Sequence, residues 1–571
     1  MTTDQELAAA QQEKAITALA PLYVQACPGA GKTHVIVSRH LAQPASLLRH
    51  GRALISFTRT ARDQMAERCR AEGRADLAGF PHFIGTMDSF IWDFLVFPHL
   101  PTDRPWQLFD SWSAVRATVQ LDRTVPLDAF TFTFDPCSGV ESVPVEALDR
   151  SARQAFHGTR RPWRHWEEEA KRVRNQLMKQ GYLTCHESRI LAWQHLRQRP
   201  DEVLVPLRSR FSEIMIDEAQ DCSTTEIAIL DTFHAAGLKL TVVGDPDQMI
   251  YGWREADRKA LTDFTAKLDS TVELTGNRRS TPTICALAAT LRTGARSPDL
   301  SIAGHHDDPP VLILPTTFGR SAKAVHSSGI DTARVFCQHA ERFSIPATSC
   351  LVTARRRATL PIPSSERGGN PITRLARAYQ VIASGIADAD KIEQACRVAA
   401  SVLLGYWFPG SSGSPASICK AHDLQVGDLL RRGYAFLAEL PQPHPAWSTD
   451  VNTTMKNVRS PSSAAPKGTA GHLRGRPVIT AKDPAQMAGP RMDNVHQVKG
   501  DQADAVLVML PETGTAAAWR EEDPAENEEL RIMYVAVTRA RRLLGMAVRD
   551  EELGEITALL TQFSVDHQVI S

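Results

Sequence analysis

The segment QACPGAGKTHV, Gln25 to Val35, constrains this chain more than any other. It has the form of a phosphate-binding loop, in which the backbone amides of a tight glycine turn at a helix N-terminus surround phosphate oxygens. Lys32 neutralises phosphate charge in such a loop, and Thr33 is a ligand for Mg²⁺. Ala26 replaces the first glycine of the usual pattern, which costs little where its backbone angles are ordinary. The loop indicates an ATP site without showing what hydrolysis drives.

Two further segments place polar side chains directly after apolar runs. IMIDEAQD puts Asp217 and Glu218 behind a buried strand, at the edge where open parallel sheets bind ligands. Asp217 suits a Mg²⁺ ligand, and Glu218 suits the base that orients and deprotonates the attacking water. VVGDPDQMIYGWREA brings Gln248 to the same edge, where an uncharged donor can contact the γ-phosphate. The residues just after it fit either ordinary core and surface packing or stacking on unpaired bases: Tyr251, Trp253 and Arg254.

The apolar pattern divides the chain into two parallel-sheet domains, each interrupted by a mainly helical insertion, so the predicted fold class is α/β. A length of 571 residues is too great for a single core. We assign 1–95 and 208–275 to the first sheet domain, 96–207 to its insertion, 276–370 and 493–571 to the second sheet domain, and 371–492 to its insertion. A Ser/Pro/Gly-rich stretch near 460–477 is expected to be flexible.

Composition limits the partners and the compartment. Lys plus Arg equals Asp plus Glu at 65 each, so a nucleic acid would have to meet a local basic groove rather than a globally basic surface. The ten cysteines are scattered without a CxxC pair, which argues against a zinc or iron–sulfur centre and for a reducing compartment. The chain has no run of about 18 apolar residues, so we expect a cytoplasmic protein without a membrane span.

In order and spacing, these segments resemble the motifs of superfamily 1 DNA helicases of the UvrD/Rep (PcrA-like) family along nearly the whole chain. AAAQQEKAI resembles the family's N-terminal glutamine motif, ACPGAGKT its phosphate loop, which commonly opens on alanine, and SFTRTARDQM a DNA-contacting motif. LTGNRRSTP, NVHQVKGDQADAVLVM and EELRIMYVAVTRARR resemble motifs of the second motor domain. The resemblance implies two RecA-like motor domains that hydrolyse ATP with Mg²⁺ and travel 3′ to 5′ along DNA.

The resemblance also assigns site residues. The catalytic set is Glu218, Gln248 and two arginine fingers, Arg279 and Arg539. The nucleotide-binding set is Gln12, Ala26, Gly29, Ala30, Gly31, Lys32, Thr33, Arg278 and Gly500, with Thr33 and Asp217 on the metal. The DNA-binding set is Thr58, Arg59, Tyr251, Trp253, Arg254 and His496.

Three positions depart from the family's pattern. Asp88 stands where a DNA-contacting histidine is usual, and Gln502 where the commonest form has glutamate. Arg278 stands where a tyrosine often stacks on adenine; a guanidinium plane also stacks on a base, so we expect looser base selectivity. Outside the motifs, RRPWRHW at 160–166 combines basic and aromatic residues, which fits either a DNA contact or two packing tryptophans at a solvated helix start.

Two functions remain open. The first is an ATP-dependent translocase and helicase acting on single-stranded or tailed duplex DNA, in repair or antiphage defence. The second is a DNA-sensing ATPase subunit that controls a separate nuclease with little unwinding of its own, as in Gabija-type antiphage systems. A second insertion shorter than in repair helicases, and a chain end soon after the last motif that leaves no fused nuclease, keep the second function open. The paired arginines and Gln248 argue against a small-molecule kinase.

Overall fold

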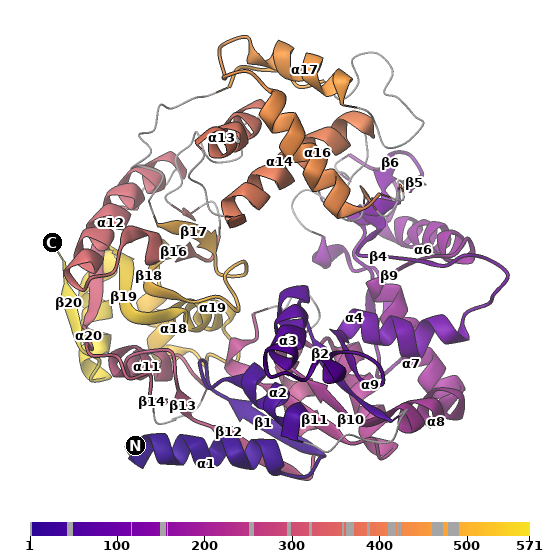
Figure 1. The fold of residues 1–571 in the computed structure, drawn as a ribbon, viewed down its shortest axis with the longest axis horizontal. Helices are drawn as coiled ribbons and strands as arrows, with labels where there is room; N and C mark the ends of the chain where they lie inside the picture. Colours follow the sequence, from indigo (N-terminus) through magenta and orange to yellow (C-terminus); the bar gives the residue numbers. More distant parts are fainter. Residues whose placement is uncertain are drawn as a thin grey trace.

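The computed structural model describes residues 3–42, 50–115, 117–148, 153, 156, 158–250, 256–293, 298–318, 322–356, 359–360, 371–384, 389–408, 418–419, 422, 424–458, 472–477 and 490–570. Two six-stranded sheets organise this part of the chain (Figure 1). Every strand pair within them is parallel. The predicted α/β fold with two parallel-sheet cores is confirmed.

The first sheet has the strand order β12–β1–β11–β10–β2–β3. Its strands are β1 (Leu22–Ala26), β2 (Gly51–Ser56), β3 (Phe83–Thr86), β10 (Phe211–Ile216), β11 (Leu240–Gly244) and β12 (Ser270–Leu274). β2 and β11 are buried along their whole length, as expected for parallel strands covered on both faces. Leu54 faces one core, while its neighbours Ala53 and Ile55 face the other. The helices of this unit are α1 (Thr3–Thr17), α2 (Lys32–Ala42), α3 (Arg59–Ala71), α4 (Met87–Phe90), α9 (Thr224–Ala235) and α10 (Arg258–Thr265).

The second sheet has the strand order β17–β16–β18–β19–β15–β20. Its strands are β15 (Val311–Thr316), β16 (Cys350–Ala354), β17 (Arg491–Asn494), β18 (Ala503–Leu510), β19 (Ala540–Arg549) and β20 (His567–Val569). Val506 and Val508 face one core, and Leu507 and Met509 the other. The helices of this unit are α11 (Pro282–Ala289), α12 (Ala322–Arg342), α18 (Thr515–Glu521), α19 (Glu528–Val537) and α20 (Leu553–Gln562). A short pair, β13 (Gly276–Asn277) and β14 (Leu300–Ser301), follows the first sheet.

The α-helices of the segment 96–207 lie in its second half. Its helices are α6 (Trp163–Lys179), α7 (Cys185–Gln198) and α8 (Pro200–Arg210). Before them lie short strands that apolar periodicity did not reveal, because three residues are too few to show alternation. They are β4 (Gln107–Phe109), β5 (Thr118–Gln120), β6 (Thr124–Pro126), β7 (Thr133–Asp135) and β8 (Val140–Ser142), and β4 pairs with β9 (Tyr182–Thr184).

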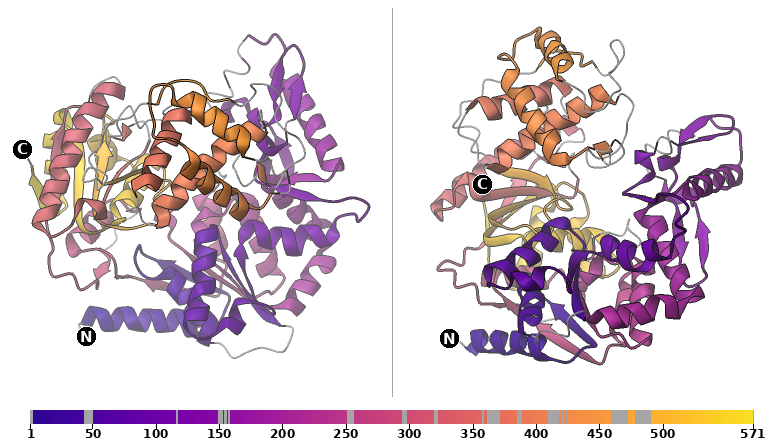
Figure 2. Two further views of the ribbon diagram at one scale, coloured as in Figure 1. Left: turned by 45° about the horizontal axis from the view of Figure 1, so that its top comes forward. Right: turned by 45° about the vertical axis from the view of Figure 1, so that its right-hand side comes forward.

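The second insertion is a helical unit with its own core. It contains α13 (Pro371–Ser384), α14 (Ala389–Trp407), α16 (Val426–Glu439) and α17 (Trp447–Asn457). Trp407, Phe436 and Trp447 pack together inside it. The second insertion, and the strands β5 and β6 of the first, lie on the side of the sheets away from α1 (Figure 1 and Figure 2). Of the stretch near 460–477, residues 460–471 lie outside the described part of the chain. Among the helices that the structure describes, none has the length and apolar character that a bilayer crossing requires.

Candidate active site

The loop between β1 and α2 has the geometry of a phosphate cradle. Gly29 and Gly31 have φ angles of 76° and 84°, in the region that favours glycine. A Cβ on Gly29 would lie 2.5 Å from Asn277 Oδ1 and 2.7 Å from Arg279 Cβ, so the loop packs directly against the segment that leads into the second unit. Ala26 is the last residue of β1 and is buried. Because strand geometry suits any residue, alanine replaces glycine there without strain.

Two carboxylates stand beside this loop at the end of β10. Asp217 is 1% exposed, and its Oδ2 accepts a hydrogen bond of 2.9 Å from the Thr33 hydroxyl. Lys32 Nζ lies 3.6 Å from Glu218 Oε2. Burial, together with the charge of Glu218, raises the pKa of Asp217 to about 7. Burial also opposes ionisation of Glu218, but the positive charges of Lys32 and Lys499 lower its pKa below the ordinary value.

The oxygen atoms of Thr33 and Asp217 fit a magnesium site. A hydroxyl and a carboxylate are the hard donors that Mg²⁺ prefers, and Mg²⁺ is usually held by one or two protein ligands together with substrate phosphates. A buried carboxylate with a raised pKa is a group whose charged form a bound cation would stabilise.

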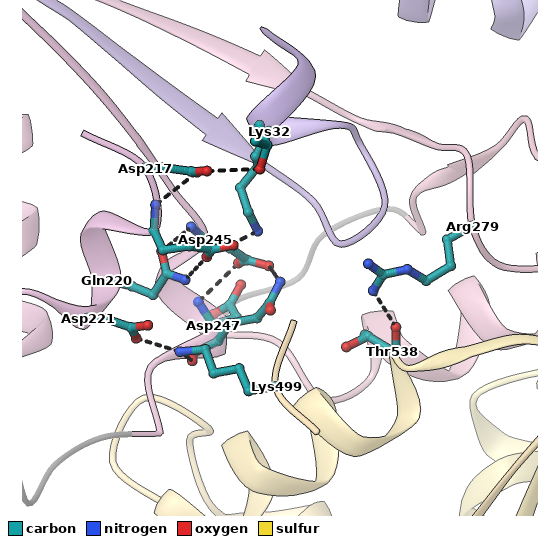
Figure 3. Close-up of polar contacts among 12 residues, drawn as sticks. Lys32, Asp217, Gln220, Asp221, Asp245, Asp247, Arg279, Lys499 and Thr538 are labelled. Atoms are coloured by element: carbon teal, nitrogen blue, oxygen red, sulfur yellow. Dashed lines mark hydrogen bonds and ion pairs between the residues drawn. The ribbon is translucent and has the colours of Figure 1, made fainter. Parts of the chain in front are cut away.

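Gln248 connects the two sheet units. It lies in a short 3₁₀ turn after β11, where its Nε2 donates to Asp245 Oδ2 over 2.7 Å. From the second unit, Arg539 donates to Gln248 Oε1 over 3.1 Å, and Lys499 Nζ donates to the Gln248 carbonyl over 3.1 Å. Lys499 also forms a buried ion pair with Asp221 (Figure 3). The side chain predicted to sense the γ-phosphate is therefore held from both sides.

The two predicted arginine fingers differ in their surroundings. Arg279 donates to the Thr538 carbonyl over 2.9 Å (Figure 3) and to Gln502 Oε1 over 3.2 Å. Burial and the nearby charge of Arg539 lower the pKa of Arg279 to about 9, so it is still a cation at neutral pH. Arg539 is 2% exposed and also donates to the Val535 carbonyl over 2.9 Å. Arg279 thus stands near the cavity surface, whereas Arg539 is part of the interior.

A cavity of about 350 Å³ lies between the two units. Most of the predicted catalytic and nucleotide-binding residues line it, namely Gly29, Gly31, Lys32, Thr33, Glu218, Gln248, Arg278, Arg279, Gly500 and Arg539. The remaining residues of these sets sit behind the lining. Ala26, Ala30 and Asp217 are buried, and Gln12 donates through Nε2 to the Ala30 carbonyl over 2.9 Å. The structure therefore gathers one continuous site from segments that are far apart in the sequence.

The predicted DNA-binding residues are more dispersed. The Thr58 hydroxyl accepts a hydrogen bond of 3.1 Å from the Ala61 N–H as the N-cap of α3, and Thr58 also lines the nucleotide cavity. Arg59 is exposed at the start of α3, and His496 is half-buried. Three further residues lie outside the described part of the chain: Tyr251, Trp253 and Arg254. DNA contact by these six residues stays a prediction.

Several polar contacts of the site could not be predicted from any local pattern in the sequence. Tyr534 Oη donates to Asp245 Oδ2 over 3.2 Å and accepts from Arg292, which forms a buried ion pair with Asp299. Lys499 pairs with Asp221 across 278 positions of the chain. The only available signal was that Lys499, Asp221 and Tyr534 fall inside the motif segments.

The structure also shows how side chains of two ambiguous segments pack. The Asp88 carboxylate lies 2.7 Å from the guanidinium of Arg189 in α7, which lies 3.0 Å from Glu226 in α9. Asp88 therefore joins α4 to an internal ion-pair cluster. Trp163 stacks on Phe130 and Trp166 is fully buried, so the tryptophans of 160–166 pack in the core of the first insertion.

Comparison with known proteins agrees with this geometry. Residues 8–269 match the model of the family described as UvrD/REP helicase N-terminal domain. The chain carries a UvrD/REP helicase N-terminal domain. It is also 24% identical over 592 aligned positions to the ATP-dependent DNA helicase UvrD2 of Mycobacterium tuberculosis, with 94% of this chain and 78% of the relative covered.

Other relatives match a shorter part of the chain. DNA helicase II of Escherichia coli is 26% identical over 298 positions, covering 49% of this chain and 39% of the relative. The ATP-dependent DNA helicase PcrA of Leuconostoc citreum is 26% identical over 294 positions, covering 48% and 37%. The UvrD/REP domain includes the phosphate loop, both acidic residues and Gln248. The predicted resemblance to UvrD/Rep helicases is confirmed.

Proposed function

We propose that this protein is an ATP-dependent DNA helicase that moves 3′ to 5′ along a single strand. The observation that carries the proposal is the cavity in which Lys32 and Glu218 of the UvrD/REP domain face Arg279 and Arg539 of the second unit. The relatives named as ATP-dependent DNA helicases support the same activity. The direction of travel rests on the resemblance to the UvrD/Rep family.

The residues of the first unit would bind the triphosphate and prepare the attacking water. The loop amides and Lys32 hold the phosphates. Thr33 and Asp217 would hold Mg²⁺, which would supply neutralisation of phosphate charge. Glu218 is ionised and points into the cavity, so it orients a water molecule and takes its proton.

The residues of the second unit would complete the site. Arg279 and Arg539 stabilise the charge that develops on the transferred phosphoryl group, a contribution of roughly 10³–10⁵ in rate. Arg539 is already bonded to Gln248, so a change at the γ-phosphate is transmitted directly to the second unit. Because the two units each hold part of the site, hydrolysis and product release are tied to their relative motion. Repeated closure and opening would then move the protein along DNA.

The proposed substrate is single-stranded or tailed duplex DNA, and the proposed setting is DNA repair or antiphage defence. The direct test is steady-state ATP hydrolysis by the whole chain with and without single-stranded DNA. We expect strong stimulation by DNA, and loss of activity in Lys32→Ala and Glu218→Gln. Unwinding of a 3′-tailed duplex, but not a 5′-tailed one, would then establish the direction.

A lack of ATP hydrolysis would distinguish between the two functions that the sequence left open. Background hydrolysis by a folded chain, with and without DNA, would overturn the proposal of a self-sufficient helicase. It would favour the partner-dependent ATPase subunit that controls a separate nuclease. Equal activity of Glu218→Gln and the unaltered chain would show that the assigned catalytic base is wrong.

A further inference from the structure

The rim of the nucleotide cavity beside the phosphate loop is lined by His34, Arg68 and Arg278. All three side chains are exposed. His34 directly follows the loop residue Thr33, and Arg278 lies against Gly29. A base attached to a triphosphate in the loop would therefore meet this rim.

Arg278 is tied to the first unit by two hydrogen bonds. Its backbone N–H donates to the Gly29 carbonyl over 3.0 Å. Its guanidinium donates to Gln12 Oε1 over 2.9 Å, and Gln12 Nε2 donates in turn to the Ala30 carbonyl over 2.9 Å. Each polar atom of the Gln12 amide thus makes one hydrogen bond within the protein, and Arg278 is the partner of its oxygen.

The guanidinium of Arg278 changes what the rim can recognise. A free glutamine amide pairs with adenine by accepting from N6 and donating to N7. Here the Gln12 oxygen accepts from Arg278 and the nitrogen donates to the loop. A guanidinium has donors only, so it pairs with the adjacent O6 and N7 acceptors of guanine, whereas adenine presents an amino donor beside its N7. The planar group also stacks on either purine.

We propose that Arg278 makes this site accept guanine as well as adenine, so that GTP and ATP are both substrates. The inference rests on the proposed function and names its substrate class as purine nucleoside triphosphates. Pyrimidines have no N7 acceptor and a smaller stacking surface, so they are weaker substrates. Arg278 is the specificity-determining residue, and Gln12 acts through its bond to it.

The test is kcat/KM for ATP, GTP and CTP, measured on the whole chain with saturating single-stranded DNA. For the unaltered protein we expect kcat/KM for GTP to lie within about threefold of that for ATP, because the rim has no hydrogen-bonding group that would exclude guanine. Arg278→Tyr removes the donor and frees Gln12, so the preference for ATP over GTP should rise by about tenfold. Arg70→Ala is the control, since Arg70 is exposed on α3 and does not line the cavity; its ratio of kcat/KM for ATP to that for GTP should not change.

A preference of the unaltered protein for ATP above about thirtyfold would overturn the inference. So would an unchanged ratio of kcat/KM for ATP to that for GTP in Arg278→Tyr, or an equal change of this ratio in Arg70→Ala. Displacement of a fluorescent ATP analogue by ATP and by GTP measures the same selectivity without hydrolysis. If neither nucleotide is hydrolysed, the proposed function fails. Displacement of the analogue by ATP and GTP at similar concentrations would still support the inferred base selectivity, and displacement at very different concentrations would overturn it.

Discussion

At the residue scale, the two predicted arginine fingers differ in how much each contributes to the stability of the fold. Arg279 makes two side-chain hydrogen bonds at the edge of the cavity, to Thr538 and Gln502. Arg539 is almost fully buried, and its guanidinium donates to Val535, Asp501, Thr538 and Gln248. Removing a buried, hydrogen-bonded charge leaves its acceptors without partners, which costs more than removing an exposed one.

We therefore expect Arg279→Ala and Arg539→Ala to separate activity from stability. Each should lower DNA-stimulated kcat by roughly 10³, the low end for an arginine finger. Only Arg539→Ala should also lower the free energy of unfolding, by about 2–4 kcal/mol. Turnover assays and thermal unfolding of the same preparations test both parts. An equal fall in unfolding temperature for the two variants would contradict the contrast in burial.

Two histidines in the first unit make a pH-dependent contribution to stability. His40 Nδ1 accepts from Arg52 Nε over 2.9 Å, and His82 Nδ1 accepts from the Arg52 N–H over 3.1 Å. Burial, and then the charge of Arg52, lower the pKa of each ring to about 4. The unfolded chain, with histidine pKa near 6.5, binds more protons below that pH. Stability should be full above pH 6.5 and fall as the pH drops toward 4.

The loss should reach up to about 3 kcal/mol for each histidine at the acid end. Urea unfolding at a series of pH values from 7.5 to 4.5 measures it. His82→Asn keeps an acceptor for the Arg52 N–H but cannot titrate, so its stability should depend less steeply on pH. If the free energy of unfolding depends on pH equally steeply in His82→Asn and in the unaltered chain, His82 does not contribute to the pH dependence.

At the element scale, α1 bridges the phosphate loop and the start of the second unit. Gln11 exchanges hydrogen bonds with Thr275 between β12 and β13, and Gln12 connects the loop with Arg278. The helix lies close to β13: a Cβ on Gly276 would stand 2.4 Å from Ala8 Cβ. The position of α1 is thus set by the space left at Gly276.

Gly276→Ala should displace α1 and weaken nucleotide binding. The added methyl cannot fit without moving Ala8 and, with it, the rest of α1. We expect KM for ATP to rise by about tenfold, since small misplacements of a binding group are expensive. Gly405→Ala in α14 is the matched control, because its Cβ would meet no atom within 4 Å. Unchanged KM in Gly276→Ala would show that α1 adapts without moving Gln12.

The phosphate loop and the elements around it show how much of the site can be predicted from the sequence. The phosphate loop and the strands before Lys32, Asp217 and Gln248 were predictable because each is a local pattern, an apolar run followed by polar residues. The bond between Arg278 and Gln12 joins positions 266 apart and has no local signature. Trp166 illustrates a different limit: an aromatic residue beside arginines has the same pattern whether it stacks on a base or packs in a core.

At the scale of the whole molecule, the two sheet units touch through a row of polar contacts beside the cavity. Lys499 reaches Asp221 and the Gln248 carbonyl, and Arg531 Nε donates to the Met249 carbonyl over 2.9 Å. The side chains of Lys499 and Asp221 are 7% and 6% exposed. The ion pair between Lys499 and Asp221 in this contact surface is therefore shielded from solvent.

Lys499→Met should loosen this contact. It leaves the buried Asp221 carboxylate without its ammonium partner, which favours an arrangement in which the two units separate and water reaches Asp221. We expect a larger radius of gyration by small-angle scattering, and DNA-stimulated turnover lower by about 10–100-fold because Arg279 and Arg539 are less often in place. A non-hydrolysable ATP analogue should restore compactness, since its phosphates bind both units.

Lys259→Met, which removes an exposed ion pair within α10, should change neither the radius of gyration nor the turnover. An unchanged radius of gyration in Lys499→Met would mean that the remaining contacts hold the units together without this ion pair.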